Sequence, residues 1–245
     1  MKNRQNKIVF ALARRFVALG LALLALGACQ SVPEQAPGAL RTAPDAAERR
    51  EAPANAVRYA IDPDRSDIRF LVYRAGPLAR LGHNHVIQAK NVRGEIRFAS
   101  EIRRSTFSIT MPAKDFAVDE ASARGDEGEA FAVQPDAEAI AGTTANMIGE
   151  KVLDGANYPN IEIESIDLNG PAWGPDARIR ITLHGQTREM SVPIAFAAEG
   201  NRITVTTFLT IKQTDFGITP MSVLGGGLQV DDAIRIRARI VAVRK

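Results

Sequence analysis

The sequence predicts an all-β fold with one helix, built as an antiparallel β-barrel or strongly curved sheet of about eight strands. Apolar and polar residues alternate over many short runs, which is the period-2 pattern of strands with one buried face. Turn residues such as Asn169-Gly170-Pro171 separate most of these runs. Closing the sheet into a barrel would hide the edges that such strands otherwise expose.

The first 28 residues are typical of a bacterial signal peptide. A basic start without acidic residues precedes an apolar run over 16–26, which is too short to span a bilayer. The run ends in Leu26-Gly27-Ala28-Cys29, which resembles a lipoprotein cleavage box, and Cys29 is the only cysteine of the chain. We therefore expect a lipid on Cys29, with an ordinary signal followed by a stray cysteine as the alternative.

Removal of residues 1–28 changes the charge balance of the chain. This segment holds five of the 31 Lys and Arg and none of the 28 Asp and Glu, which leaves 26 basic against 28 acidic residues. The basic character of the whole chain therefore belongs to the targeting segment and gives no reason to expect nucleic acid as a partner. With its one cysteine lipidated, the chain has no intramolecular disulfide and depends on its core.

Residues 29–56 are predicted to be the lipidated Cys29 and a disordered tether. The segment is rich in Ala, Pro, Glu and Arg and holds almost no bulky apolar residue, so it cannot bury enough surface to offset chain ordering. Gln30 stands where an Asp would favour retention at the inner membrane of Gram-negative bacteria. By resemblance to such lipoproteins, we expect the periplasmic face of the outer membrane.

The remaining residues, 57–245, are enough for one domain with a substantial core. The strands expected in this domain are 59–62, 68–73, 92–98, 106–111, 161–166, 178–183, 191–197, 201–211 and 234–240. The one expected helix runs from Pro135-Asp136 to Leu153, with Asp136 as its N-cap and Gly155 as its stop. Irregular structure is expected over 120–130, where the acidic run 126–129 lacks the spacing of a calcium loop and is interpreted as a solvated loop.

Two of the three histidines, His83 and His85, lie between two predicted strands. On an extended backbone, side chains at i and i+2 point to the same face. Three interpretations remain open: hydrogen bonds to a ligand head group, a metal site, or satisfied structural histidines. A third metal ligand would be His184, Asp119 or Glu120, although a turn-stabilising hydrogen bond is the simpler role for His184.

Several motifs, occurring in order, resemble the YceI-like family. They are Tyr59-x-Ile61-Asp62 with Ser66-x-Ile68-x-Phe70, Gly94-x-Ile96-x-Phe98, Val152-Leu153-Asp154 with Tyr158-Pro159-x-Ile161, Leu183-His184-Gly185-Gln186-Thr187, Ile211 to Ile218, and Asp231-x-Ala233-Ile234-x-Ile236. The resemblance implies a lipocalin-like barrel, secreted or periplasmic, with a long apolar cavity that in some members holds a polyisoprenoid chain such as a quinone tail. The sequence departs from the common pattern at Gly82-His83-Asn84-His85.

Together, the strand pattern and the resemblance predict non-enzymatic binding or carriage of an isoprenoid or quinone-like lipid in the periplasm. The candidate ligand contacts are Phe70, Val72, His83, His85, Ile181, Leu183 and Phe216. No G-x-S-x-G, H-E-x-x-H or helix-opening nucleotide loop is present in the sequence. The alternatives are a metal-binding or redox-accessory protein that depends on His83 and His85, or a structural lipoprotein with a vestigial cavity. A homodimer is left open.

Overall fold

The computed structural model describes residues 41–42 and 48–245. The predicted signal peptide, the predicted lipidation site Cys29 and residues 30–40 and 43–47 of the predicted tether lie outside the described residues. Within the described part, no helix has the length and apolar character needed to cross a membrane.

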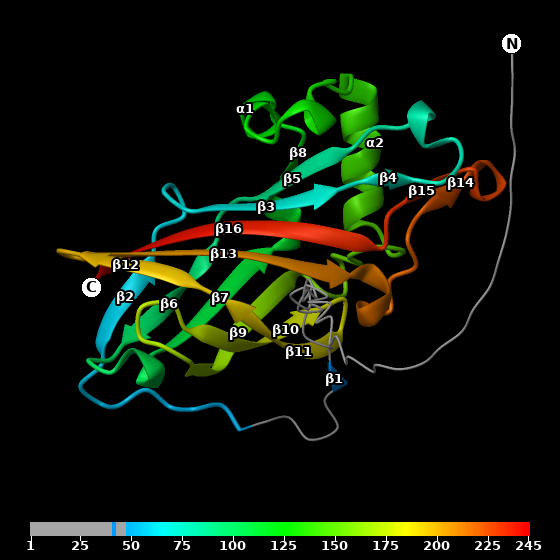
Figure 1. The fold of residues 1–245 in the computed structure, drawn as a ribbon. Helices are drawn as coiled ribbons and strands as arrows, with labels where there is room; N and C mark the ends of the chain where they lie inside the picture. Colours follow the sequence, from blue (N-terminus) through cyan, green and yellow to red (C-terminus); the bar gives the residue numbers. More distant parts are fainter. Residues whose placement is uncertain (1–40, 43–47) are drawn as a thin grey trace, which may run out of the picture. The chain divides into compact units, whose positions relative to one another are not determined.

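A 13-stranded antiparallel sheet dominates the described part of the chain (Figure 1). Its strands are β1 (Arg41–Thr42), β2 (Val57–Ile61), β3 (Asp67–Val72), β5 (His85–Ala89), β6 (Arg93–Phe98), β7 (Thr106–Pro112), β8 (Phe116–Val118), β9 (Asn160–Asn169), β10 (Asp176–Leu183), β11 (Gln186–Pro193), β12 (Ala195–Glu199), β13 (Arg202–Lys212) and β16 (Ala233–Arg244). A second sheet of three short strands consists of β4 (Arg74–Ala75), β14 (Ser222–Val223) and β15 (Leu228–Val230).

The long strand β16 is the branch point of the large sheet. One edge pairs with β13 along its length, while the other pairs with β3 near its start and with β2 near its end. A turn at Asp62–Ser66 separates β2 from β3, and the Ser66 hydroxyl accepts a hydrogen bond from the Val241 amide of β16 at 3.0 Å. The order then runs outward from β2 through β6, β7, β9 and β10 to β11, and from β3 through β5 to β8.

The predicted closed barrel of about eight strands is not confirmed. Among the described residues no ladder joins β11 to β13, although the Thr207 hydroxyl donates a hydrogen bond of 2.7 Å to the Pro193 carbonyl and the short β12, which follows β11 after Ile194, pairs with β13. Alternation in a strand says which side chains share a face, but it does not say which strands pair. The result is a large antiparallel sheet that branches at β16 and is not closed.

The prediction of a single helix is also wrong, because the described residues form two α-helices. The first, α1 (Ala121–Gly125), lies in the segment expected to be irregular, and the second, α2 (Ala137–Ile148), is shorter than expected. Asp136 is the N-cap of α2, as predicted, and its carboxylate accepts a hydrogen bond of 2.8 Å from the Ala139 amide. The helix ends before Gly149 rather than at Gly155.

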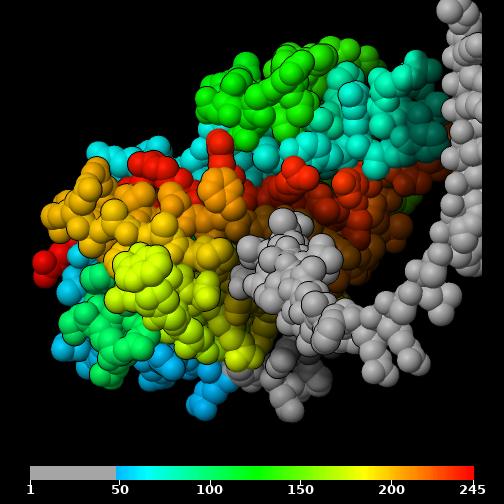
Figure 2. Space-filling view, viewed as in Figure 1, coloured from blue at the N-terminus to red at the C-terminus, as the bar shows by residue number. Residues whose placement is uncertain are grey.

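Ion pairs hold α1 and the following loop against the outer face of the sheet. Arg69 of β3 contacts Asp126 at 2.8 Å and Glu127 at 3.1 Å, and Arg237 of β16 contacts Glu127 at 2.7 Å. The Glu127 side chain is 5% exposed, so the interpretation of 126–129 as a solvated loop does not hold for this residue. Figure 2 shows the segment of α1 and α2 directly against the segment of β3 to β5.

The end of the predicted tether also contacts the sheet. The Arg50 amide donates a hydrogen bond of 2.9 Å to the Ile166 carbonyl of β9, and Arg49 forms an ion pair of 2.9 Å with Glu164. The domain therefore has contacts upstream of Val57, where the sequence alone places its first residue.

Candidate functional site

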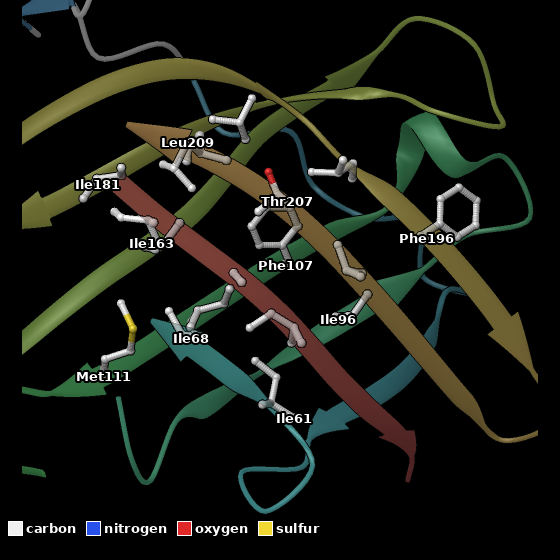
Figure 3. Close-up of a pocket in the computed structure, with 18 of the residues that line it drawn as sticks. Ile61, Ile68, Ile96, Phe107, Met111, Ile163, Ile181, Phe196, Thr207 and Leu209 are labelled. Atoms are coloured by element: carbon white, nitrogen blue, oxygen red, sulfur yellow. The ribbon is translucent and has the colours of Figure 1, made fainter. Parts of the chain in front are cut away.

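The inner faces of the strands enclose an apolar cavity of about 120 Å³. Its wall comes from β2, β3, β6, β7, β9, β10, β11, β12, β13 and β16, so it gathers side chains that are far apart in the sequence (Figure 3). Apart from Ser105, Thr106 and Thr207, every described residue of this wall is apolar. This inner cavity can accept a slender apolar group, and it offers almost no hydrogen-bonding partner.

A larger cavity of about 490 Å³ adjoins the inner one at the end of the sheet where α2 and the three-stranded sheet lie. The two share four wall residues, namely Phe70, Ile161, Leu183 and Ile211. We call the larger one the mouth cavity. Its polar wall residues are Arg74, His83, His85, Thr143, Asn146, Gln213 and Gln229. The two cavities thus adjoin along shared walls, and we call the pair the interior, with an apolar end and a mixed end.

Six of the seven residues predicted to contact a ligand line this interior. Phe70 and Leu183 line both cavities, Ile181 lines the inner cavity, and Val72, His83 and His85 line the mouth cavity. The seventh, Phe216, is fully buried in η5 (Gln213–Phe216) and is not a wall residue of either cavity. Its role in the structure is packing.

His85 is held by a buried carboxylate that sequence reasoning assigned only as one option for a metal ligand. The His85 Nδ1 lies 2.7 Å from Oδ2 of Asp119, whose side chain is completely buried. The other Asp119 oxygen accepts the Val86 amide at 2.8 Å and a hydrogen bond from Arg124 of α1. Asp119 follows β8 with a positive φ of 56°, a conformation that Asp tolerates better than most residues.

These contacts determine the ionisation of Asp119. Burial alone would raise the pKa of its carboxyl group, but hydrogen bonds from His85, the Val86 amide and Arg124 outweigh burial and lower that pKa. Asp119 is therefore an ionised carboxylate at neutral pH, paired with the Arg124 guanidinium and bonded to the His85 ring. Arg124 is fixed in turn by the Asn84 carbonyl at 2.8 Å.

The remaining histidines have different surroundings. The His83 ring lies 6.4 Å from the His85 ring between centroids, and no hydrogen bond to His83 is present among the described residues. His184 sits in the turn between β10 and β11, where its Nδ1 is 3.3 Å from the Phe216 carbonyl oxygen and its ring packs edge-on against Tyr158. Within the described part of the chain, no group of three His, Cys, Asp or Glu side chains is placed to hold a metal ion.

Sequence reasoning missed the contribution of α2 to the mouth cavity. Ala139, Thr143 and Asn146, with Gly142 and Met147 beside them, line this cavity from one face of the helix. Their spacing of i, i+4 and i+7 is the signal that could have identified this face. The pairing of Asp119 with His85 had no such signal, because 34 residues separate the two and a strand pairing brings them together.

Known proteins share the sequence pattern and the fold of this chain. The model of the YceI-like domain matches residues 59–242. The crystal structure of BcnA from Burkholderia cenocepacia superposes with a TM-score of 0.54 at 14% identity, covering 74% of this chain and 98% of that one. A polyisoprenoid binding domain from Saccharophagus degradans, implicated in plant cell wall breakdown, gives a TM-score of 0.52 at 13% identity, with 77% and 99% covered. A search of the curated proteins found no match.

Proposed function

Because this chain belongs to the YceI-like family over residues 59–242, we propose that it is a non-enzymatic protein that binds or carries one long apolar ligand. The observation that carries the proposal is the inner cavity, whose described wall is apolar except for three hydroxyl side chains. A wall of this kind gives affinity through buried area and cannot position polar reactants.

The dimensions of the interior favour a slender chain with a wider polar end. The inner cavity of about 120 Å³ is narrow, while the mouth cavity of about 490 Å³ falls in the usual range of ligand pockets. Burying roughly 300 Å² of apolar ligand surface at ~25 cal/mol per Å² contributes about 7 kcal/mol before the costs of association. That gross term is the main favourable contribution to binding, and only the part that exceeds the costs of association appears as affinity.

The ligand class that we propose is an isoprenoid or quinone-like lipid. A structurally similar domain from Saccharophagus degradans is described as polyisoprenoid binding. Two adjoining cavities that share four wall residues suit a flexible prenyl chain better than a rigid fused ring system. The metal-binding alternative has less support, because no group of three His, Cys, Asp or Glu side chains among the described residues is placed to hold a metal ion.

We also propose that the mature protein is a lipoprotein on the periplasmic face of the outer membrane. The support is in the sequence alone: an apolar segment over 16–26, the lone Cys29 behind it, and Gln30 next in line. Cys29→Ser should release the protein from membranes while the domain stays folded. If Cys29→Ser protein still sediments with membranes after a salt wash, the lipid anchor is wrong.

The test of ligand binding is native mass spectrometry of the protein purified without detergent, compared between two single substitutions to aspartate. Ile181→Asp places a carboxylate in the inner cavity, where burial without a partner disfavours the charge. Phe208→Asp is the matched control, because Phe208 is 69% exposed between the wall residues Thr207 and Leu209.

We expect bound lipid in the wild type and in Phe208→Asp, and none in Ile181→Asp at a temperature where circular dichroism still reports strands. Lipid at wild-type stoichiometry in folded Ile181→Asp would show that the ligand does not occupy the inner cavity. The proposed function would be refuted if none of the three proteins contains lipid and none takes up added prenyl lipid.

A further inference from the structure

The hydrogen bonds around His85 determine which of its two ring nitrogens carries the proton. An ionised carboxylate can only accept hydrogen bonds, so the His85 Nδ1 must donate to Asp119 Oδ2 across their 2.7 Å contact. In the neutral ring, the second nitrogen is then an acceptor without a proton. Asp119 is thus the positioning residue that fixes the His85 tautomer.

The second nitrogen of His85 is open to a ligand. His85 lines the mouth cavity, its side chain is 16% exposed, and its Nε2 has no hydrogen-bond partner among the described residues. Nε2 is also not among the described polar atoms that are buried without a partner, so it remains accessible. An accessible acceptor in a largely apolar pocket selects for a ligand group that donates a hydrogen bond.

The charged groups that face His85 are Asp119, which is also paired with Arg124, and the basic wall residues Arg74 and His83. No described wall residue of the mouth cavity is acidic. Nε2 accepts a hydrogen bond only in the neutral ring, so ligand binding is tested at pH 8.

We propose that the polar end of the ligand carries a hydroxyl group that donates a hydrogen bond to Nε2 of His85. This inference rests on the proposed function and names its ligand more closely: a long-chain alcohol or a prenylated hydroquinone, rather than the corresponding ether or quinone. The apolar chain lies in the inner cavity, and the hydroxyl oxygen lies beside His85. A long-chain alcohol and a prenylated hydroquinone both present such a hydroxyl group, so the experiment includes both.

The test compares matched ligands that differ only in the donor. Binding of geranylgeraniol and of its O-methyl ether is measured by titration at pH 8, where imidazole is neutral. A prenylated benzohydroquinone and the matching benzoquinone form the second pair, kept anaerobic. One hydrogen bond predicts that the hydroxyl ligand of each pair binds about two- to tenfold more tightly. The pair with the higher affinity identifies the source of the hydroxyl.

Two glutamine variants separate His85 from a histidine outside the cavities. In His85→Gln the side-chain amide can donate as well as accept, so the preference for the hydroxyl ligand should fall to within about twofold. His184→Gln makes the same chemical change in the turn between β10 and β11, outside both cavity walls, and it should keep the wild-type preference. Equal binding of alcohol and ether by the wild type would overturn the inference and leave the proposed function standing.

The tautomer can be observed without any ligand. The ¹⁵N chemical shifts of the wild-type protein at pH 8 should report an unprotonated Nε2 and a protonated Nδ1 in His85. Asp119→Asn, whose amide can donate or accept, should move both signals toward a mixture of tautomers. A wild-type spectrum with the proton on Nε2 overturns the inference even if the variants fail to fold. Failure of every probe to bind would refute the proposed function as well.

Discussion

The two ends of the interior are built in different ways. The inner cavity takes nearly all its wall from the inward faces of strands, and its described wall contains no titratable side chain. The mouth cavity takes its wall from strand ends, α2, the loop before β5 and the three-stranded sheet, and it holds two histidines and an arginine. The comparison teaches that affinity and selectivity can be separated: buried area at one end, a few oriented polar atoms at the other.

The largest expected effect is the loss of stability on truncating Phe216, which tests whether this side chain packs in the core or contacts the ligand. Phe216 is fully buried but is not a wall residue of either cavity, so Phe216→Ala should lower the free energy of unfolding by about 3–5 kcal/mol and leave ligand stoichiometry unchanged. Phe208→Ala is the matched control, because its exposed ring should contribute within about 0.5 kcal/mol. Urea denaturation and native mass spectrometry measure the two effects. Loss of ligand from folded Phe216→Ala would extend the site to this residue.

The second expected effect is the loss of stability in acid that comes from Asp119 beside the mouth cavity. The pKa of Asp119 is lowered in the folded state, against burial, by hydrogen bonds from His85, the Val86 amide and Arg124. The unfolded chain therefore takes up this proton first, near pH 4. The stabilisation is present above that pH and is lost as pH falls through the lowered pKa of the folded state.

Hydrogen bonds to a charged group suggest that this acid-dependent stabilisation is about 1–3 kcal/mol. The measurement is urea denaturation from pH 6 down to pH 2. Asp119→Asn should be less stable than the wild type at pH 6, and its stability should change less with pH. The comparison variant is Glu95→Gln, because hydrogen bonds from Arg97 and Arg58 lower the pKa of Glu95 to about 2 and Glu95 is not a wall residue of either cavity. An Asp119→Asn protein with the full acid dependence of the wild type would exclude Asp119 as its source.

The smallest expected effect tests whether His83 and His85 contact the ligand. Replacing both His83 and His85 by Phe puts apolar rings at these two positions and removes the imidazoles from the mouth cavity. Loss of one ligand hydrogen bond should weaken lipid binding by about 0.5–1.5 kcal/mol, with no metal in either protein by elemental analysis. Metal at one equivalent in the wild type, and none in the variant, would favour the metal-binding alternative. Unchanged lipid and metal with a shifted melting temperature would make the pair structural.

The inner cavity was largely readable from the sequence, and the mouth cavity only in part, since Val72, His83 and His85 line it but the contribution of α2 was missed. Alternation placed Phe70, Ile181 and Leu183 on a buried face, and all three line the interior. Phe216 lies in a short 3-10 helix, where a period of two carries no information about its direction. The Asp119–His85 contact depends on the pairing of β5 with β8, which no local pattern specifies. The prediction of a closed sheet was not confirmed for the same reason, because closure depends on which strands pair and not on which face a side chain occupies.

The position of β16 in the sheet has a consequence for how the chain acquires its structure. This last strand joins β13, β3 and β2, and its pairing of Ala242 with Ile61 links residues about 180 positions apart. The two branches of the sheet cannot be united before residues 233–244 have been synthesised. Contacts of such long sequence separation slow folding. A nascent chain of this protein therefore lacks the ladders that unite β2, β3 and β13 until residues 233–244 have left the ribosome, and the strands made earlier cannot complete the sheet by themselves.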